Sequence, residues 1–222
     1  MNTETIEFRR EFVEVCKLMA DRRLVAGTEG NVSGRAPDGS IIMSPSGYNL
    51  ADVTVDVLVA VDLDGAVVDG SATPTSEMPM HLGFYRQRPK TVGVVHGHPA
   101  FATAFAATGR ELPHNILPEL VAVIGKIPTI PYGRPSSPKL AAALAPHVTN
   151  YNVFLLQNHG AVAAGSSVRD AYHRLEVAEA YAKTAWAAES LGGIRPLTPS
   201  DRGHNQRRHA DEDCHEGEEH PL

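Results

Sequence analysis

Apolar residues recur at helical spacing in two segments, one near the start of the chain and one after residue 167. The apolar side of a predicted helix over residues 5–20 consists of Phe8, Phe12, Val15, Leu18 and Met19. A spacing of three or four residues is typical of an amphipathic helix that packs on a core. The longest helical pattern starts after Ser167, a suitable N-cap, and ends at Gly192 and Gly193.

Between these two helices, short apolar runs alternate with turn residues. Residues 31–35 and 41–45 flank a Pro-Asp-Gly turn, and residues 57–68 repeat this pattern around Asp-Gly, so each segment predicts a hairpin. Residues 91–96 predict a further strand. Residues 153–165 predict a strand, a turn and a second strand.

Shorter helices are predicted among these strands. One follows Ser76 and ends by Pro89, a second begins at Pro99, and a third begins near Ser137 and Pro138. Hairpins mixed with helices argue against a purely parallel sheet. The pattern therefore favours an α/β fold with a mostly antiparallel sheet covered by helices.

Composition indicates one globular domain followed by a polar tail. The 222 residues are 42% hydrophobic, which is enough to bury a substantial core. We place the domain at residues 1–195. Residues 196–222 are polar, rich in histidine and acidic residues, and without periodicity, which is typical of a mobile tail.

Charge and cysteine usage exclude several classes of partner. Residues 211–219 supply six carboxylates to the formal net charge of -6, so the body is nearly neutral and offers no basic surface for nucleic acid. The first residues lack the apolar core of a secretory signal, and no apolar run approaches the roughly 20 residues of a membrane span. Cys16 and Cys214 make no disulfide framework. We therefore expect a cytoplasmic protein with no membrane partner.

Two histidines end a predicted strand in the segment VVHGHP. Because strand side chains alternate between faces, His96 and His98 point to the same side. Gly97 between them permits a close approach on the opposite face. A catalytic zinc site needs three protein ligands and an open position, so this pair supplies two of the three. Histidine pairs at this spacing are also common where no metal binds, and the motif needs a third ligand.

His159 is the best candidate for that third ligand. It follows an apolar strand in LLQNHGAV and precedes a glycine, and functional residues gather at strand ends and in loops. The alternative is a turn histidine that only hydrogen-bonds the backbone. The remaining histidines have weaker contexts, namely predicted helices for His81 and His173, loops for His114 and His147, and the tail for the other four.

Hydroxyls and an acidic residue stand at a predicted helix start. Thr75 and Ser76 precede Glu77, which we place just inside the helix, and helix N-termini bind anions through free N–H groups. The same residues also make an ordinary N-cap. Two glycine-containing turns, GTEGNVSG and SPSGYN, would let backbone N–H groups approach a phosphate. Neither turn matches a P-loop or a dinucleotide-binding motif.

Five motifs in order, GTEGNVSGR, SPSG, PTSE, VVHGHP and LLQNHGAVAAG, closely resemble those of the class II aldolase/adducin family, especially its fuculose-phosphate aldolases. The resemblance covers about residues 5–192. It implies a three-layer α/β/α fold around a mostly antiparallel sheet. It also implies a cyclic homotetramer with active sites near the subunit interfaces.

The resemblance further implies roles for individual residues. One Zn²⁺ per subunit would be held by His96, His98 and His159, and Glu77 would exchange protons with the carbon acid. The implied phosphate-binding positions are Gly30, Asn31, Ser46, Gly47, Thr75 and Ser76. The implied reaction is cleavage of a ketose 1-phosphate, such as a fuculose or 5-deoxypentulose phosphate, through an enediolate. Its products would be dihydroxyacetone phosphate and an aldehyde.

One segment departs from the family pattern. The fuculose-phosphate enzymes carry a tyrosine that is donated across the interface, whereas this chain has none between Tyr85 and Tyr132. Leu117, Pro118 and Glu119 occupy the approximate place. Glu119 could act as an acid, line the pocket, or simply stand in the first turn of a helix.

Three other functions stay open. A 3-oxo-tetronate 4-phosphate decarboxylase of the same family would use much the same residues. The pentulose-phosphate 4-epimerases carry an additional Asp in the region of residues 112–120, which has none here, so epimerisation is disfavoured. A non-catalytic, adducin-like binding domain would need neither three ligands nor a base.

Overall fold

The computed structural model describes residues 3–198, except for the side chains of residues 119, 121 and 122. The acid role considered for Glu119 therefore lies outside the described residues. The predicted tail, residues 196–222, also lies almost wholly outside them, and the domain boundary at residue 195 stays a prediction. Among residues 3–198, no helix has both the length and the apolar character needed to cross a membrane.

A single eight-stranded sheet forms the middle of the molecule. The strand order is β4-β3-β2-β1-β5-β8-β7-β6, and all neighbours pair antiparallel except β6 and β7. The strands are β1 (Asn31–Arg35), β2 (Ile41–Met43), β3 (Val59–Val61), β4 (Val67–Asp69), β5 (Gly93–Gly97), β6 (Thr129–Ile130), β7 (Val153–Leu156) and β8 (Gly160–Gly165). The predicted mostly antiparallel sheet is confirmed.

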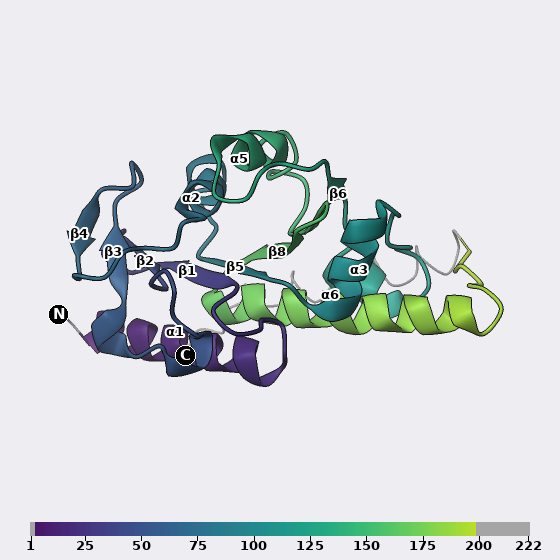
Figure 1. Ribbon diagram of the computed structural model, residues 1–222, viewed down its shortest axis with the longest axis horizontal. Coiled ribbons are helices and arrows are strands. Elements are labelled where there is room, and N and C mark those ends of the chain that lie inside the picture. Colours follow the sequence, from purple (N-terminus) through teal and green to yellow (C-terminus); the bar gives the residue numbers. More distant parts are fainter. Residues whose placement is uncertain (1–2, 199–222) are drawn as a thin grey trace, which may run out of the picture.

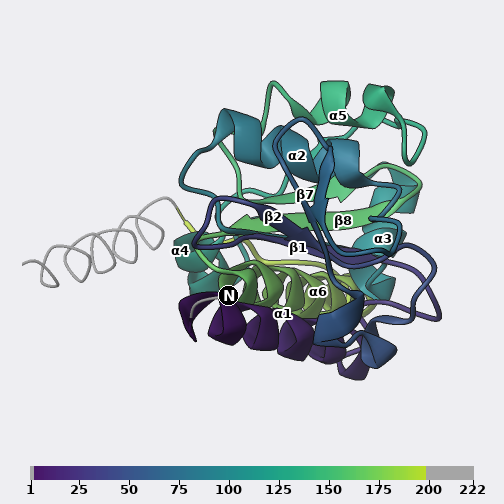
Figure 2. The same cartoon turned by 90° about the vertical axis from the view of Figure 1, so that its left-hand side faces the viewer.

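Helices cover both faces of this sheet (Figures 1 and 2). On one face α1 (Thr3–Asp21) and α6 (Val168–Ser190) lie side by side, and α3 (Ala100–Thr108) packs against α6. The other face carries α2 (Met78–Gln87) and α5 (Pro138–Leu144). The predicted three-layer α/β/α fold is thus confirmed. Short elements in the connections are the 3-10 helices η1 (Leu50–Asp52) and η2 (Val55–Val57) and the helix α4 (Pro118–Val123).

Strand alternation divides the core into two apolar clusters, one on each face. In β5, Val95 belongs to the cluster that contains Phe12 of α1, whereas Val94 belongs to the cluster that contains Phe84 of α2. His96 lies two residues after Val94, so it shares the α2 face of the sheet. The residues that follow the buried strand β5 are therefore placed at the edge of a packed apolar layer.

The predicted cap at the start of α6 agrees with the structure, whereas Pro99, expected in the first turn of α3, lies just before that helix. Ser167 caps α6, because its hydroxyl accepts a hydrogen bond from the backbone N–H of Asp170 at 2.9 Å. For the segment that lacks the family tyrosine, one alternative was that Pro118 and the residue after it start a helix, and α4 does begin at Pro118. The placement of Glu77 was also wrong, because it is the N-cap of α2 and does not lie inside the helix. Its N–H donates to Thr75 Oγ1 at 3.3 Å, which holds the residue just outside the first turn.

Candidate metal centre and binding cavity

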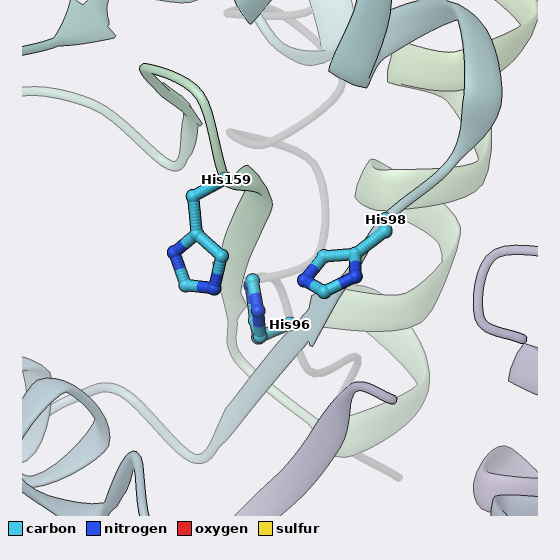
Figure 3. A group of neighbouring side chains, drawn as sticks. All are labelled: His96, His98 and His159. Atoms are coloured by element: carbon cyan, nitrogen blue, oxygen red, sulfur yellow. The ribbon is translucent and has the colours of Figure 1, made fainter. Parts of the chain in front are cut away.

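Three imidazoles meet at the end of the central strands (Figure 3). His96 lies in β5, His98 follows that strand, and His159 lies in the turn between β7 and β8. Ring centroids are 5.0 Å apart for His96 and His98, 4.6 Å for His96 and His159, and 5.2 Å for His98 and His159. One ligand nitrogen from each ring can be chosen so that all three lie within 4.8 Å of one another. Side chains this close can share one metal ion.

Backbone contact behind Gly97 fixes the position of the two strand histidines. A Cβ at Gly97 would lie 2.4 Å from the carbonyl oxygen of Leu24, so only glycine allows this approach. That carbonyl accepts a hydrogen bond from the N–H of His98 at 2.9 Å. The end of β5 is therefore held from the face opposite the imidazoles.

The turn that carries His159 packs directly on the end of β5. Asn158 has a left-handed φ of 54°, which Asn adopts more readily than most residues. A Cβ at Gly160 would lie 2.5 Å from the carbonyl oxygen of Gly97 and 2.5 Å from Cδ2 of His98. This close packing brings the third imidazole to the other two.

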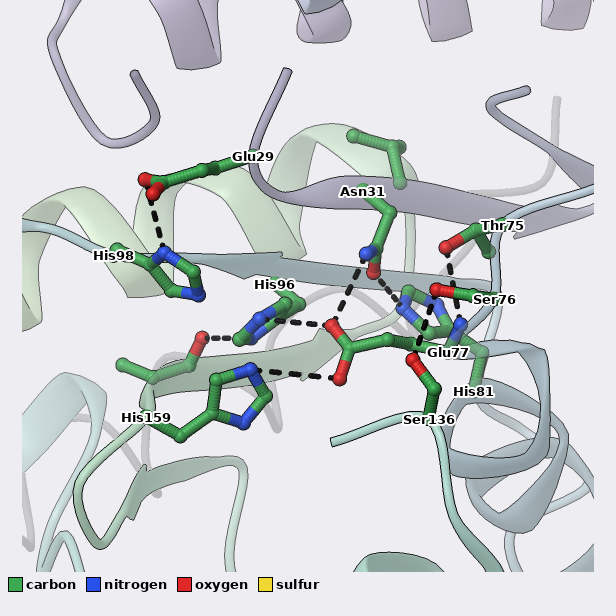
Figure 4. A network of polar contacts seen from close by, with 12 residues as sticks. Glu29, Asn31, Thr75, Ser76, Glu77, His81, His96, His98, Ser136 and His159 are labelled. Atoms are coloured by element: carbon green, nitrogen blue, oxygen red, sulfur yellow. Dashed lines mark hydrogen bonds and ion pairs between the residues drawn. The ribbon is translucent and has the colours of Figure 1, made fainter. Parts of the chain in front are cut away.

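Glu77 faces the imidazole cluster from the N-cap of α2 (Figure 4). Its Oε2 lies 3.0 Å from Nε2 of His96, and its Oε1 lies 3.5 Å from Nε2 of His159. The side-chain N–H of Asn31 donates to Oε2 at 3.2 Å. The Glu77 side chain is only 8% exposed, and a buried carboxylate is costly unless cations or strong donors surround it.

The hydrogen bonds of the imidazoles decide which nitrogens are free to bind a cation. Nδ1 of His96 lies 2.9 Å from the carbonyl oxygen of Ala161, which can only accept, so Nδ1 carries the proton. Nδ1 of His98 donates in the same way to the Glu29 carboxylate at 3.0 Å. The Nε2 lone pair of His96 then faces Glu77 Oε2, and two such acceptors repel unless a positive charge lies beside them. Nε2 of His98 is buried and has no hydrogen-bond partner among the described residues. This donor set fits a metal ion.

Burial and neighbouring polar groups shift the pKa values of His98, His159 and Glu77 toward the forms that bind a cation. Desolvation lowers the pKa of His159 to about 4 and also lowers the pKa of His98. For Glu77, desolvation alone would raise the pKa, but the interactions with His96 and, more weakly, with His159 outweigh it. The Asn31 hydrogen bond acts in the same direction, and the pKa of Glu77 is held below its usual range. Neutral imidazoles at His98 and His159 beside an ionised carboxylate suit a divalent cation.

A cavity of about 200 Å³ connects this cluster with solvent. It is lined by every position expected to bind phosphate, namely Gly30, Asn31, Ser46, Gly47, Thr75 and Ser76. The φ angles of Gly30 and Gly47 are 73° and 79°, which explains glycine at both places. None of the lining residues in the described part of the chain is Lys or Arg. An anion here would therefore be bound by hydroxyls, backbone N–H groups and the N-terminus of α2.

Three further described residues belong to the site without having been predicted. Glu29 accepts the His98 hydrogen bond, and the Ser136 hydroxyl hydrogen-bonds that of Ser76 at 2.9 Å across the cavity lining. His81, which the sequence placed only in a helix, lies 2.5 Å from Asn31 Oδ1. The spacing of four residues between Glu77 and His81 was a usable signal, because such residues share a helix face. Ser136, with a left-handed φ of 59°, comes from a distant loop and carried no signal.

Fold and site together define an α/β/α protein with a candidate three-histidine metal centre beside a buried carboxylate and an anion-binding cavity. The chain belongs to the family described as Class II Aldolase and Adducin N-terminal domain, whose model matches residues 10–186. The resemblance seen in the five motifs is thereby confirmed. Family membership supports an enzyme of the aldolase or lyase type.

Individual relatives carry more than one activity. The chain is 35% identical over 182 residues to an L-fuculose phosphate aldolase of Methanococcus maripaludis, which covers 82% of this chain and 97% of the relative. It is 33% identical over 193 residues to a 3-oxo-tetronate 4-phosphate decarboxylase of Haemophilus influenzae, covering 85% and 91%. The crystal structure of YgbL from Escherichia coli, described as an aldolase, epimerase or decarboxylase, superposes with a TM-score of 0.86 at 29% identity, covering 92% of this chain and 100% of that chain. Identity alone does not choose among these reactions.

Proposed function

We propose that this protein is a zinc-dependent aldolase that cleaves a ketose 1-phosphate into dihydroxyacetone phosphate and an aldehyde. The observation that carries the proposal is the position of Glu77. Its two oxygens lie 3.0 and 3.5 Å from Nε2 of His96 and His159, at a cavity whose lining includes the hydroxyls of Ser46, Thr75 and Ser76. A carboxylate in contact with a metal centre and open to a substrate cavity is suited to moving a proton at carbon.

The metal would be held by His96, His98 and His159, and Zn²⁺ is proposed because it favours three imidazoles with a fourth position left open. When bound, a divalent cation there would polarise the carbonyl group of the substrate and favour charge on its oxygen. Hydrogen bonds from His96 Nδ1 to Ala161 and from His98 Nδ1 to Glu29 hold two of the rings in the ligating tautomer.

Glu77 is proposed as the group that moves the proton. In the cleavage direction the carboxylate would take up the proton that the substrate hydroxyl releases as the C–C bond breaks, directly or through water, and would give a proton to the carbon that loses the aldehyde. In the reverse direction it would remove a proton from that carbon. Its pKa is held below the usual range in the structure, so it starts as a carboxylate, and the Asn31 amide keeps it oriented toward the cavity. The residue needs no large movement to reach a molecule in the cavity, because it lines the wall.

Phosphate binding is proposed for Gly30, Asn31, Ser46, Gly47, Thr75 and Ser76. Hydroxyl and backbone donors from three separate segments line one side of the cavity, which suits the three terminal oxygens of a phosphate. We add Ser136 to this set, since its hydroxyl contacts that of Ser76. A homotetramer and a cytoplasmic location, both expected from the sequence, belong to the same proposal.

A 3-oxo-tetronate 4-phosphate decarboxylase is the second candidate. The chain is 33% identical to the Haemophilus influenzae decarboxylase and 35% identical to the Methanococcus maripaludis aldolase, so the two relatives support the two reactions about equally. The absence of a tyrosine between Tyr85 and Tyr132 supports this second candidate, because a departing CO₂ requires no group to take up the proton of the hydroxyl that becomes the aldehyde in aldol cleavage. The two reactions release different products, which makes them separable by direct assay.

Product analysis tests the proposal. The purified full-length protein is incubated with a panel of ketose 1-phosphates and with a 3-oxo-tetronate 4-phosphate, and dihydroxyacetone phosphate and CO₂ are measured separately. Glu77→Gln should lower turnover by about 10²- to 10⁴-fold, the usual contribution of a general acid–base group. Glu4→Gln, at the exposed start of α1, is the matched control and should keep wild-type turnover. Unchanged turnover in Glu77→Gln contradicts the assigned role.

Metal analysis tests the zinc assignment. The chain also carries four tail histidines, His204, His209, His215 and His220, so these should be changed to Gln together. This variant should keep about one zinc per chain, as a single three-histidine site requires. His96→Ala in the same background should lose it. Zinc that disappears with the tail histidines instead contradicts the proposed site.

A further inference from the structure

A buried series of hydrogen-bonding side chains leads from Glu77 away from the cavity. Asn31 contacts Glu77 at 3.2 Å and His81 Nε2 at 2.5 Å, and His81 Nδ1 contacts Ser33 Oγ at 2.6 Å. Ser33 Oγ in turn contacts the Tyr85 hydroxyl at 2.8 Å. Figure 4 shows the near end of this series, where His81 lies behind Asn31 and Glu77. We call Tyr85, Ser33, His81 and Asn31 the polar series.

The polar series lies between β1 and α2, inside an otherwise apolar layer. Ser33 and His81 are 0% exposed, Tyr85 is 1% exposed and Asn31 is 6% exposed. Strand alternation puts Asn31 and Ser33 on the same face of β1, and a spacing of four residues lines up Glu77, His81 and Tyr85 along α2. A buried polar group is costly unless it is hydrogen-bonded, and an apolar residue would avoid that risk. Four hydrogen-bonded polar side chains in succession therefore point to a role in fixing the geometry of this layer.

The direction of each hydrogen bond follows from counting donors and acceptors. An ionised Glu77 can only accept, so the Asn31 amide must present its NH₂ group to Glu77 and its oxygen to His81. Because that oxygen also only accepts, Nε2 of His81 must carry a proton. A neutral His81 then accepts a hydrogen bond at Nδ1, so the Ser33 hydroxyl donates its one hydrogen to His81. The Ser33 oxygen in turn accepts a hydrogen bond from the Tyr85 hydroxyl. A single reversal anywhere would place two acceptors or two donors against each other.

Two members of the polar series, His81 and Tyr85, cannot easily change their protonation. Burial lowers the pKa of His81 to about 3, so the ring is neutral at physiological pH. Burial also raises the pKa of Tyr85, which leaves its hydroxyl a permanent donor. The series therefore runs in one direction, from the donor Tyr85 to the acceptor Glu77.

We propose that His81 is a positioning residue: in its neutral tautomer, protonated at Nε2, it locks the Asn31 amide so that the NH₂ group faces Glu77. A free amide of Asn could rotate by half a turn and present its oxygen to the carboxylate, which would repel Glu77 from its place beside His96. The role in turnover rests on the proposed function, whereas the tautomer and the amide orientation stand without it.

Nitrogen NMR of the full-length protein tests the tautomer directly. In protein labelled with ¹⁵N histidine, two-bond nitrogen–proton correlations distinguish a protonated ring nitrogen from an unprotonated one, and the His81 signals are assigned by their absence in His81→Gln. We expect a protonated Nε2 and an unprotonated Nδ1 from pH 6 to 8, with zinc and after chelation. A charged ring, or protonation at Nδ1, overturns the proposal. This readout needs no activity, so it stays decisive if the aldolase assignment fails.

Variants of His81 test the consequence for turnover. His81→Phe keeps the approximate size but removes both contacts, and should lower kcat by about 30-fold, the usual effect of losing a hydrogen bond next to a charged group. KM and the zinc content should stay near wild type. His81→Gln can still donate to Asn31 from its side-chain nitrogen and should recover most of kcat. Exposed His173 on α6 offers the matched control, since His173→Gln should keep wild-type kcat.

The pattern across the variants separates positioning from general stability. If His81→Phe and His81→Gln lose the same activity in proportion to lost folded protein, His81 is a packing residue and the proposal is wrong. If His81→Phe keeps the kcat of His173→Gln, it is wrong as well. A selective loss of kcat in the Phe variant with recovery in the Gln variant supports the proposal.

Discussion

Gly97→Ala should destabilise the fold and weaken the metal centre together, although it adds only one methyl group. The added Cβ would lie 2.4 Å from the carbonyl oxygen of Leu24 and 3.1 Å from Cγ1 of Val25. Ordinary contacts of a Cβ begin at 3.4 Å, so the backbone at residue 24 must retreat by about 1 Å, the difference of the two distances. Retreat breaks the hydrogen bond of 2.9 Å from the N–H of His98 to that same carbonyl.

The energetic terms can be estimated from this geometry. Overpacking against backbone costs about 1–3 kcal/mol, and the lost hydrogen bond costs about 1 kcal/mol. Alanine also reduces the entropy of the unfolded chain, which returns about 0.5 kcal/mol. The free energy of unfolding should therefore fall by about 1.5–3.5 kcal/mol, a large part of the 5–15 kcal/mol typical of a domain. Because His98 moves with the strand end, zinc affinity should fall as well.

Urea unfolding followed by far-UV circular dichroism, at one protein concentration and after chelation of metal, measures the first effect. The midpoint should fall by roughly 1 M, given usual urea dependences. Gly83→Ala is the matched control. A Cβ there meets nothing within 4 Å, and glycine inside helix α2 is unfavourable, so this variant should gain up to about 1 kcal/mol. Equal midpoints for wild type and Gly97→Ala would refute the steric argument.

Three further predictions follow from the site. Because the pKa of His81 is lowered to about 3, unfolding takes up a proton below the ordinary value of 6.5, and stability should fall with decreasing pH by up to about 1.4 kcal/mol per unit. The range from pH 6.5 to 4.5 lies above the pH at which protonation of Glu77 affects stability. In this range, and with metal removed by a chelator, the free energy of unfolding of His81→Gln, measured by urea titration, should fall less steeply with decreasing pH than that of wild type. Equal slopes would contradict the lowered pKa of His81. Ser136→Ala should raise KM for a sugar phosphate by about tenfold, because the variant loses one hydrogen bond to the substrate. Ser137→Ala is the neighbouring control, and equal KM values for Ser136→Ala and wild type would contradict the assignment. Glu29→Gln should weaken zinc binding by roughly tenfold in competition with a chromogenic chelator, unlike exposed Glu111→Gln, and equal affinities would show that the carboxylate does not support its imidazole.

Local rules were sufficient for most of the fold. The Pro-Asp-Gly and Asp-Gly turns predicted both hairpins, and β1 with β2 and β3 with β4 pair as expected. Ser167 marked the start of α6 because its capping geometry involves only the next three residues. The order of strands was beyond these rules. The pairing of β1 with β5 joins segments about 60 residues apart, and β6 has only two residues, too few for a pattern.

The candidate site divides in the same way. His96 and His98 could be read from alternation within one strand, and His159 from its place after another. Their meeting depends on β5 and β8 being neighbours, with His96 opposite Val162. Ser136 could not be found, because its approach to Ser76 is set by a loop conformation with a left-handed φ.

Hydrogen-bond direction is the part of the site that a sequence hides most completely. His81 and Ser33 look like a helix residue and a strand residue, and nothing in either segment alone shows that they touch. Once β1 and α2 pack, the acceptor Glu77 at one end and the donor Tyr85 at the other leave a single consistent arrangement of protons between them. The same alternation that sends Val94 into the apolar layer sends His96 to its edge, where His96 Nε2 lies 3.0 Å from Oε2 of Glu77, the acceptor at the end of the polar series. Changes inside α2 should therefore reach the cavity through Asn31, even where they leave all three imidazoles in place.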